Sequence, residues 1–293
     1  MLYLKIMNTP TSLPIDNATA NFTKALEAKK LSPATILAYI TDIKQLNQFP
    51  FTQGLTQLGQ ITFQHLELYQ KSLVKKGYLA VSVARKLNAI RAFFEFCQKE
   101  RFLLQNPASS LASPKFEKET PRILSRMEYR ALRDSCRSNP RTAALIEIFL
   151  QTGLKVNEVA KLTPQDIKKD RLVIRNKNSR EIPLTNACKK AIDRYLKVRP
   201  DAKVTNLFVT KNGTPLLVRN MSTILMRCFS AAEIKDASLN SLRHTWIYTQ
   251  LVGGMPLQLV SQLAGHKRIN TAARYLTLIE KKQLPTRNRL IEL

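Results

Sequence analysis

A proline-rich stretch near the middle of the chain divides it into two parts. Residues 106–121, NPASSLASPKFEKETP, contain three prolines and charges of both signs. Proline fixes its own φ and has no backbone donor, so this segment cannot continue a helix or a central strand. We therefore expect an N-terminal tail over 1–16, a first domain over 17–107, a linker over 108–122 and a second domain over 123–293.

The sequence before the linker predicts a small helical domain. Ser32 and Pro33 are typical of a helix cap and first turn, and apolar residues then recur every three or four positions. A second stripe with this spacing runs from Val83 to Cys97. Between the two, FQHLELYQKSLVKKG predicts a third helix, which Gly77 ends.

The sequence after the linker predicts further helices and one β-hairpin. Ser125 and Glu128 have the spacing of a capping box, and Gly153 ends a later apolar helix. Residues 172–184, LVIRNKNSREIPL, place two β-type runs around a polar turn and predict a hairpin. LFVT, residues 207–210, is expected to add a strand beside it. The chain as a whole is expected to be mainly α with a small β-sheet.

The composition indicates a polyanionic partner. Lys and Arg number 47 against 21 Asp and Glu, which gives a net charge of +26. Chains this basic usually bind nucleic acid. An anionic membrane is the competing partner, but no signal peptide and no run of about 18 apolar residues is visible, so we expect a cytoplasmic protein. The four cysteines form no CxxC pair, which argues against a zinc site and for buried free thiols.

Three short stretches carry side chains of chemical interest. QTGLKVNEVAKL spans residues 151–162, SLNSLRHTWIYTQLVGG spans 238–254 and LAGHKRINTAARYLT spans 263–277. The third stretch puts Tyr275 nine residues after His266, with lysine and arginines close by. A tyrosine in so positive a neighbourhood is either a structural phenol packed on a helix or a phenol that attacks a negatively charged group.

These stretches resemble the motifs of the tyrosine recombinase (phage integrase) family, and of its Xer-like members in particular. Family patterns TGLRxxEL, HxLRH and LLGH, and a tyrosine nine residues after the last histidine, occur here in the same order. The matching residues are Thr152, Gly153, Leu154 and Glu158, then Leu242, Arg243 and His244, then Leu263, Gly265 and His266, and finally Tyr275. The resemblance also covers the N-terminal half. It implies a helical core-binding (SAM-like) domain and an α+β catalytic domain with a small sheet.

The chemistry of strand exchange explains why such residue types are needed. A tyrosine can attack the phosphorus, hold the strand as a 3′-phosphotyrosine and so conserve the energy of the bond. Fixed cations stabilise the charge that gathers on the phosphate oxygens, and the planar fork of arginine does this best. We therefore expect Tyr275 to be the nucleophile, Arg243 the phosphate clamp and His266 a hydrogen-bond donor. His244 is expected to help with the tyrosine proton. By resemblance, Glu158 orients the cations.

Three positions depart from the family pattern. Lys155 stands in place of an arginine, so it keeps the charge and loses the fork. Asn240 stands in place of the first histidine of HxLRH, so it can donate a hydrogen bond but cannot shuttle a proton. The family uses a hairpin lysine to protonate the leaving 5′-oxygen. Counting back from Pro183 puts that position at Arg175, a poor acid, and we favour Lys177, the lysine of the hairpin.

Two classes of function remain open from the sequence. The first is a site-specific DNA recombinase that integrates, excises or resolves mobile DNA or replicon dimers. The second is a catalytically impaired DNA-binding or regulatory protein of the same fold, which Lys155 and Asn240 keep open. A helix-turn-helix regulator has no need of these motif spacings. A metal-dependent nuclease would need a carboxylate cluster, and carboxylates near the motifs are few.

The resemblance also implies how the chain meets its partners. We expect double-stranded DNA with short inverted-repeat core sites, two protomers on each site and four in the synaptic complex, without a metal or other cofactor. The two basic domains are expected to close around the duplex and to contact mainly phosphate. The tail over 278–293, through Leu290, Ile291 and Leu293, is expected to dock on a neighbouring protomer.

Overall fold

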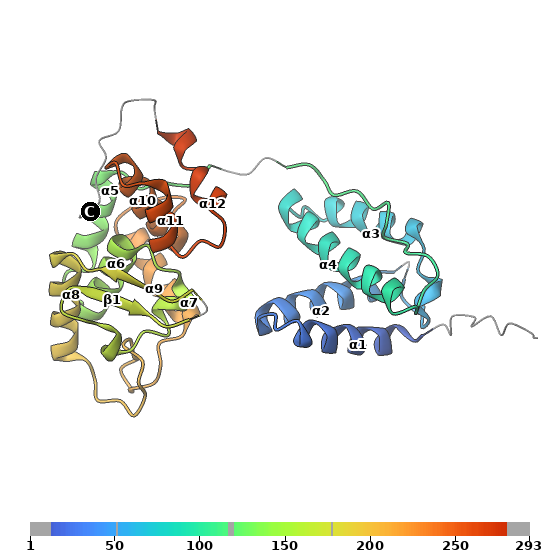
Figure 1. Ribbon diagram of the computed structural model, residues 1–293, viewed down its shortest axis with the longest axis horizontal. Helices are drawn as coiled ribbons and strands as arrows, with labels where there is room; N and C mark the ends of the chain where they lie inside the picture. The colour runs from blue at the N-terminus through green and yellow to red at the C-terminus, as the bar shows by residue number, and fades with distance from the viewer. Residues whose placement is uncertain (1–12, 51, 117–119, 177, 280–293) are drawn as a thin grey trace, which may run out of the picture. The chain divides into compact units, whose positions relative to one another are not determined.

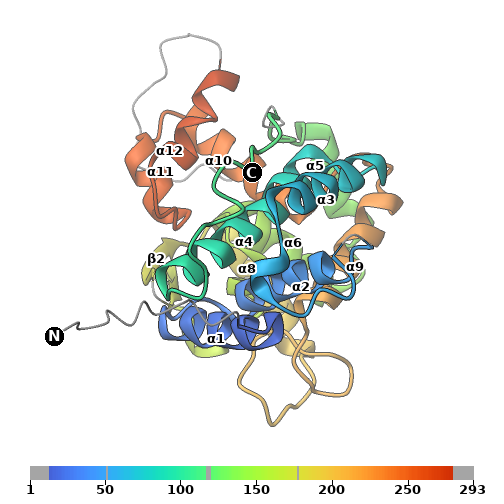
Figure 2. The same ribbon diagram turned by 90° about the vertical axis from the view of Figure 1, so that its right-hand side faces the viewer.

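The chain forms two compact units, each with its own hydrophobic core. In this computed structural model they comprise Met1–Lys118 and Glu119–Leu293. Figure 1 and Figure 2 show the units from two sides. The structure describes residues 13–50, 52–116, 120–176 and 178–279. Within these ranges, no helix is both long and apolar enough to cross a membrane.

The first unit is helical, as predicted. Ser32 caps its second helix by accepting a hydrogen bond from the Thr35 amide at 3.1 Å, and Pro33 is the first residue of that helix. The apolar stripe from Val83 to Cys97 lies on the buried face of its longest helix. The described elements are α1 (Ile15–Ala28), α2 (Pro33–Asn47), the short 3-10 turn η1 (Leu58–Gln60), α3 (Phe63–Lys75) and α4 (Ala80–Lys99).

A charged network is buried between α2 and α4. Asp42 is 1% exposed and accepts hydrogen bonds from both terminal nitrogens of Arg85, at 2.5 and 3.0 Å. The ammonium of Lys86 lies 2.9 Å from the same carboxylate and 2.5 Å from the side-chain oxygen of Gln45. The carboxylate therefore has two cationic partners, and the network ties the two helices together.

The first part of the expected linker packs on this unit instead of running free. Ala108 and Leu111 are buried in the first core, and Arg91 of α4 donates a hydrogen bond to the Leu111 carbonyl at 3.0 Å. The prolines still prevent a helix here. The chain therefore leaves α4 through a series of turns that pack on the first core.

The second unit is built around a central helix, α6 (Pro140–Thr152), of which ten of 13 residues are buried. A helix that is buried on all sides needs neighbours on all sides. The helices that pack against it are α5 (Arg126–Ser135), α8 (Asn186–Val198), α9 (Val218–Ala231) and α10 (Leu239–Val252). The predicted capping box of Ser125 and Glu128 begins α5.

Gly153 ends α6, as the sequence predicts, and two constraints require glycine there. Its φ is +59°, a left-handed conformation that side chains disfavour. A Cβ atom at this position would also lie 2.3 Å from the Trp246 ring of α10. The chain can therefore turn sharply against α10, which brings Leu154 and Lys155 to the end of the central helix.

The predicted hairpin is confirmed, and the strand expected beside it is wrong. Strands β1 (Arg171–Ile174) and β2 (Arg180–Pro183) pair antiparallel, and they form a two-stranded sheet within the described residues. Residues 207–210 make an isolated bridge between Val209 and Pro215 instead. Tertiary contacts override the β-type sequence there, because the Leu207 amide donates to the Leu162 carbonyl, away from the sheet.

The remaining elements are short and lie close to the sequence motifs. They are α7 (Val156–Val159), η2 (Pro164–Asp166), α11 (Leu257–Leu263), α12 (Asn270–Ala273) and η3 (Leu276–Leu278). The expectation of a mainly α chain with a small sheet is thus confirmed. All four cysteines are free thiols. Cys97, Cys136 and Cys188 are buried and Cys228 is half-buried.

Candidate active site

The three sequence motifs and the tyrosine meet at one end of α6. The loop after α6 and the turn after α11 both lie against the first turns of α10, and α10, α11 and α12 lie side by side in Figure 1 and Figure 2. Residues far apart in the sequence therefore form one cluster. This cluster holds Lys155, Glu158, Arg243, His244, His266 and Tyr275 of the predicted site.

Arg243 is a buried cation whose hydrogen bonds, among the described residues, go to backbone carbonyls. It is 7% exposed on α10. Its guanidinium donates to the Gly153 carbonyl and, at 2.7 Å, to the Ala264 carbonyl. Burial lowers the pKa of Arg243 to about 10, although Glu158 nearby acts in the opposite direction. The protein thus holds this guanidinium in place without fully compensating its charge.

Tyr275 and His244 are hydrogen-bonded to each other. The phenol oxygen lies 2.5 Å from Nδ1 of His244, and Tyr275 is 2% exposed. Burial raises the pKa of the phenol, while Arg274 and Arg243 act to lower it. Burial, followed by the same two arginines, lowers the pKa of His244 to about 4. A neutral imidazole at near-neutral pH can accept the phenol proton.

The turn after α11 presents three consecutive carbonyls to three cationic side chains. The Leu263 carbonyl accepts from Nε of Arg180 at 2.7 Å. The Ala264 carbonyl accepts from Arg243, and the Gly265 carbonyl accepts from the Lys155 ammonium at 3.3 Å. These three carbonyls therefore set the spacing of the cations.

His266 follows directly on this turn. Its amide donates to the Ser261 carbonyl at 3.0 Å, which fixes the backbone. Its Nδ1 is buried and has no hydrogen-bond partner among the described residues. Burial, then the positive charges of Arg243, Lys155 and Arg180, lower the pKa of His266 to about 4. A buried, unpartnered ring nitrogen beside several cations suits a ligand with anionic oxygens.

Glu158 and Arg180 form a buried ion pair beneath this turn. Two parallel hydrogen bonds of 2.8 and 2.9 Å join them, and their side chains are 8% and 5% exposed. Glu158 also accepts from the Lys155 amide at 2.9 Å and from the Asn176 side chain at 3.2 Å. Burial would raise the pKa of Glu158, but these bonds, chiefly from Arg180, outweigh it and the pKa is lowered.

Arg180 is the member of the cluster that the sequence reasoning missed. By resemblance, Glu158 was expected to orient the cations, and its bidentate partner is Arg180. One signal was available. Arg180 opens β2 on the face that also carries Ile182, so an arginine stands where the strand pattern calls for an inward residue.

The other predicted site residues lie outside this cluster or outside the described ranges. Asn240 is exposed on the first turn of α10. Arg175 is exposed, and its Nε lies 3.0 Å from Asp166. Lys177, the preferred proton donor, lies outside the described residues. So does most of the tail expected to dock on a neighbour, including Leu290, Ile291 and Leu293.

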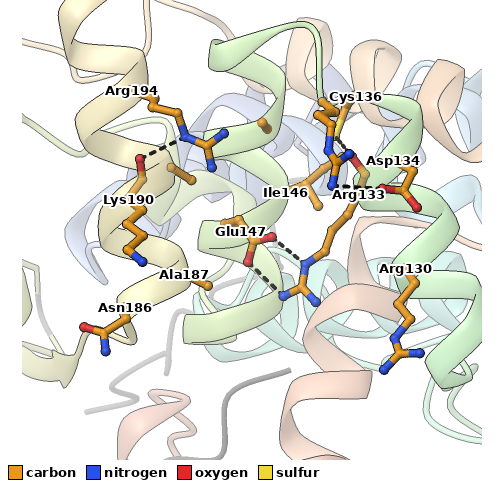
Figure 3. A pocket seen from close by; sticks show the side chains of 13 residues that line it. Arg130, Arg133, Asp134, Cys136, Ile146, Glu147, Asn186, Ala187, Lys190 and Arg194 are labelled. Carbon is orange, nitrogen blue, oxygen red and sulfur yellow. Dashed lines mark hydrogen bonds and ion pairs between the residues drawn. The ribbon is translucent and has the colours of Figure 1, made fainter.

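A cavity of about 470 Å³ lies elsewhere in the second unit, between α5, α6 and α8 (Figure 3). Its cationic lining residues are Arg130, Arg133, Arg137, Lys190 and Arg194. Arg133 is already paired with Glu147, at 2.5 and 2.9 Å. No histidine or tyrosine lines this cavity, and it shares no residue with the cluster around Arg243. It therefore lacks the tyrosine and histidines that the cluster around Arg243 provides. Among the described residues, no group of three or more His, Cys, Asp or Glu could hold a metal ion.

Comparison with known proteins gives a consistent result for both units. The sequence matches the model of the Phage integrase family over residues 117–282, and that of the Phage integrase, N-terminal SAM-like domain over residues 20–101. It is 31% identical over 278 residues to a tyrosine recombinase XerC of Natranaerobius thermophilus, which covers 88% of this chain and 93% of the relative.

Many solved structures share the fold, and two serve as examples. One is a lambda integrase dimer bound to a COC′ core site, with a TM-score of 0.73 and 18% identity over 92% of this chain and 78% of that chain. The other is a lambda integrase tetramer bound to a Holliday junction, with a TM-score of 0.72 and 18% identity over 89% of this chain and 80% of that chain.

Proposed function

Because the chain belongs to the phage integrase family and is a site-specific DNA recombinase, we propose that Tyr275 is the nucleophile that cleaves the strand. The observation that carries this proposal is the 2.5 Å hydrogen bond between the Tyr275 phenol and His244, made beside the buried cation Arg243. A structural tyrosine would need neither a neutral histidine at its oxygen nor an uncompensated guanidinium nearby.

In the proposed cleavage step, the phenol oxygen of Tyr275 attacks the scissile phosphorus. Its proton passes to Nδ1 of His244, which lies 2.5 Å from the phenol oxygen. The bond from phosphorus to the 5′-oxygen breaks, and the strand stays attached through a 3′-phosphotyrosine. Attack by the 5′-hydroxyl of another strand reverses these events, so no bond energy is lost and no cofactor is consumed.

We propose that three side chains hold the phosphate during this step, those of Arg243, Lys155 and His266. Arg243 and Lys155 rest on the Ala264 and Gly265 carbonyls, and charge-assisted bonds to phosphate oxygens are stronger than bonds to neutral carbonyls. The two cations can therefore turn to the phosphate when DNA binds. His266 adds a neutral donor beside them. Asn240, three residues before Arg243, remains a candidate donor to a neighbouring phosphate.

Protonation of the leaving 5′-oxygen is assigned to the hairpin. Arg175 is already paired with Asp166, and a guanidinium is a poor proton donor, which argues against Arg175 as the acid. We therefore propose Lys177 for this role.

The proposed partner is double-stranded DNA with short inverted-repeat core sites, bound by two protomers per site and by four in the synapse. The dimeric and tetrameric DNA complexes of lambda integrase, which share this fold, support such an assembly. The net charge of +26 supports contact with phosphate. DNA affinity should then fall steeply with salt concentration. We also propose a cytoplasmic location, which a DNA partner supports.

Covalent trapping tests the proposal. A nicked duplex that loses its short 5′-hydroxyl strand after cleavage is built from DNA flanking the gene and incubated with the wild-type protein and Tyr275→Phe. We expect an SDS-resistant protein–DNA adduct with the wild type and none with Tyr275→Phe. An adduct that persists in Tyr275→Phe would assign the nucleophile elsewhere. Sequence-specific binding without any adduct would indicate a protein that binds DNA but does not cleave it.

A further inference from the structure

Arg180 differs from the other two cations on the 263–265 turn. Arg243 and Lys155 bond to carbonyls, whereas Arg180 bonds to the Leu263 carbonyl and also to both carboxylate oxygens of Glu158. We propose that Arg180 is a positioning residue for strand cleavage, which holds this turn where Arg243, Lys155 and His266 can reach one phosphate. The inference rests on the phosphate-binding role proposed for those three residues.

The hydrogen bonds of Arg180 indicate that it stays with the protein when the substrate binds. Its Nε, Nη1 and Nη2 all have partners, and its side chain is 5% exposed. Its charge is neutralised by Glu158 at 2.8 and 2.9 Å. A phosphate would have to compete with a buried carboxylate for this guanidinium, whereas at Arg243 it competes with neutral carbonyls.

We call Arg180 and its hydrogen bonds to Glu158 and Leu263 the anchor. Its geometry requires the planar guanidinium of arginine. One edge of the guanidinium binds the Glu158 carboxylate, while Nε binds the Leu263 carbonyl on a different segment of the chain. A lysine ammonium is a single point donor and cannot hold both in this arrangement. Gly265 makes room for the fork, because a Cβ there would lie 2.6 Å from Nη1 of Arg180.

The anchor reaches three parts of the proposed site. Through Glu158 it fixes the Lys155 amide at 2.9 Å and the Asn176 side chain of the hairpin turn at 3.2 Å. Through Leu263 it fixes the carbonyls on which Arg243 and Lys155 rest. Without Arg180, we expect Glu158 and the turn to shift together. A displacement of about 1 Å at a reacting centre is enough to reduce a rate about 100-fold.

Three variants test this role: Arg180→Gln, Arg180→Lys and, as a control, Arg171→Gln. Arg171 lies on the same hairpin, but it is about half exposed, and its ion pair with Glu181 at 3.3 Å is on the surface. Adduct formation on the nicked duplex is followed in single turnover at saturating protein, and the Kd for the same duplex is measured separately. We expect Arg180→Gln to cleave about 10- to 100-fold more slowly with its Kd within about twofold of wild type. Arg180→Lys should be intermediate and Arg171→Gln unchanged.

Hydrogen exchange gives a second readout that does not depend on cleavage. The Gly265 and His266 amides bond to the Gln262 and Ser261 carbonyls, and their exchange should be faster in Arg180→Gln than in wild type. If the wild type forms no adduct, the proposed function fails while the exchange rates still decide the role of Arg180. Unchanged exchange or wild-type cleavage in Arg180→Gln would overturn the inference. So would a loss of rate in Arg180→Lys that is fully matched by a loss of Tm or of DNA affinity.

Discussion

Each unit buries a charged network, and the two networks differ in how the charge is balanced. In the first unit, the carboxylate of Asp42 has Arg85 and Lys86 as partners, so the anion is part of the protein. In the second unit, Arg243 and Lys155 rest on backbone carbonyls, and burial lowers the pKa of both. The second network is therefore short of negative charge.

The first network stabilises the fold, whereas the second carries excess positive charge that an anionic substrate can neutralise. A buried ion that has its counterion contributes to holding its helices together, and removal of the counterion is costly. A buried cation without a counterion gains most from an anion that arrives later, such as a phosphate. Substitutions in the two networks should accordingly affect different measurements.

Arg243→Gln should produce the largest effect, and that effect should be a loss of cleavage rate. The neutral amide cannot offset the charge of the transition state, so adduct formation on the nicked duplex should fall about 1000-fold. The free energy of unfolding should change by only about 1 kcal/mol, because glutamine can keep one of the hydrogen bonds to a carbonyl. Retained cleavage together with a large loss of stability in urea would instead show that Arg243, like Lys86, mainly stabilises the fold.

Asp42→Asn should show the opposite pattern. The side chain of Lys86 is 6% exposed, and without the carboxylate its charge would be buried and unbalanced. We expect the free energy of unfolding to fall by about 3 kcal/mol, measured in urea on the full chain. The single-turnover cleavage rate at saturating DNA should stay near that of wild type. Arg85→Gln is a matched control with a smaller effect, because the Arg85 side chain is half exposed.

Lys155→Arg should strengthen the binding of phosphate by the second network. The guanidinium keeps the positive charge and can bind two phosphate oxygens at once. Adduct formation should become about 10- to 100-fold faster, equivalent to about 1 to 3 kcal/mol of transition-state stabilisation. Lys161→Arg, at an exposed lysine of the same motif region, serves as the control. An equal or slower rate in Lys155→Arg would show that the site is shaped for lysine.

A last prediction concerns the dependence of stability on pH. Burial lowers the pKa of both His244 and His266 from 6.5 to about 4, so between these values the unfolded chain binds more protons than the folded one. The free energy of unfolding should be constant just above pH 6.5 and should decrease as the pH falls from about 6.5 to about 4. Urea titrations at several pH values measure this change. The double variant His244→Gln, His266→Gln should flatten it, and an equally steep dependence in that variant would contradict the assignment.

Local rules predicted the parts of the fold that depend on neighbours in the sequence. The cap at Ser32, the capping box at Ser125 and the turn at Gly153 each depend on a few consecutive residues, and each is found as predicted. The strand expected at 207–210 was wrong because its backbone bonds go to distant partners, which β-propensity does not encode.

The site likewise contains features that the sequence can predict and features that depend on contacts between distant residues. The spacing of the motifs was enough to nominate Arg243, His266 and Tyr275. It could not reveal the pair of Glu158 with Arg180, which are 22 residues apart and meet only in the fold. Nor could it reveal the three carbonyls that hold the cations, because every residue has a carbonyl and sequence carries no sign of its direction.

The close contact between Gly153 and Trp246 has a consequence for how this chain can vary. Because a Cβ at position 153 would overlap the indole ring, a larger residue there demands a smaller one at position 246. A library randomised at either position alone should return the starting residue. A library randomised at both should admit a residue that tolerates the φ of +59° at position 153, such as asparagine, only together with a smaller residue at position 246.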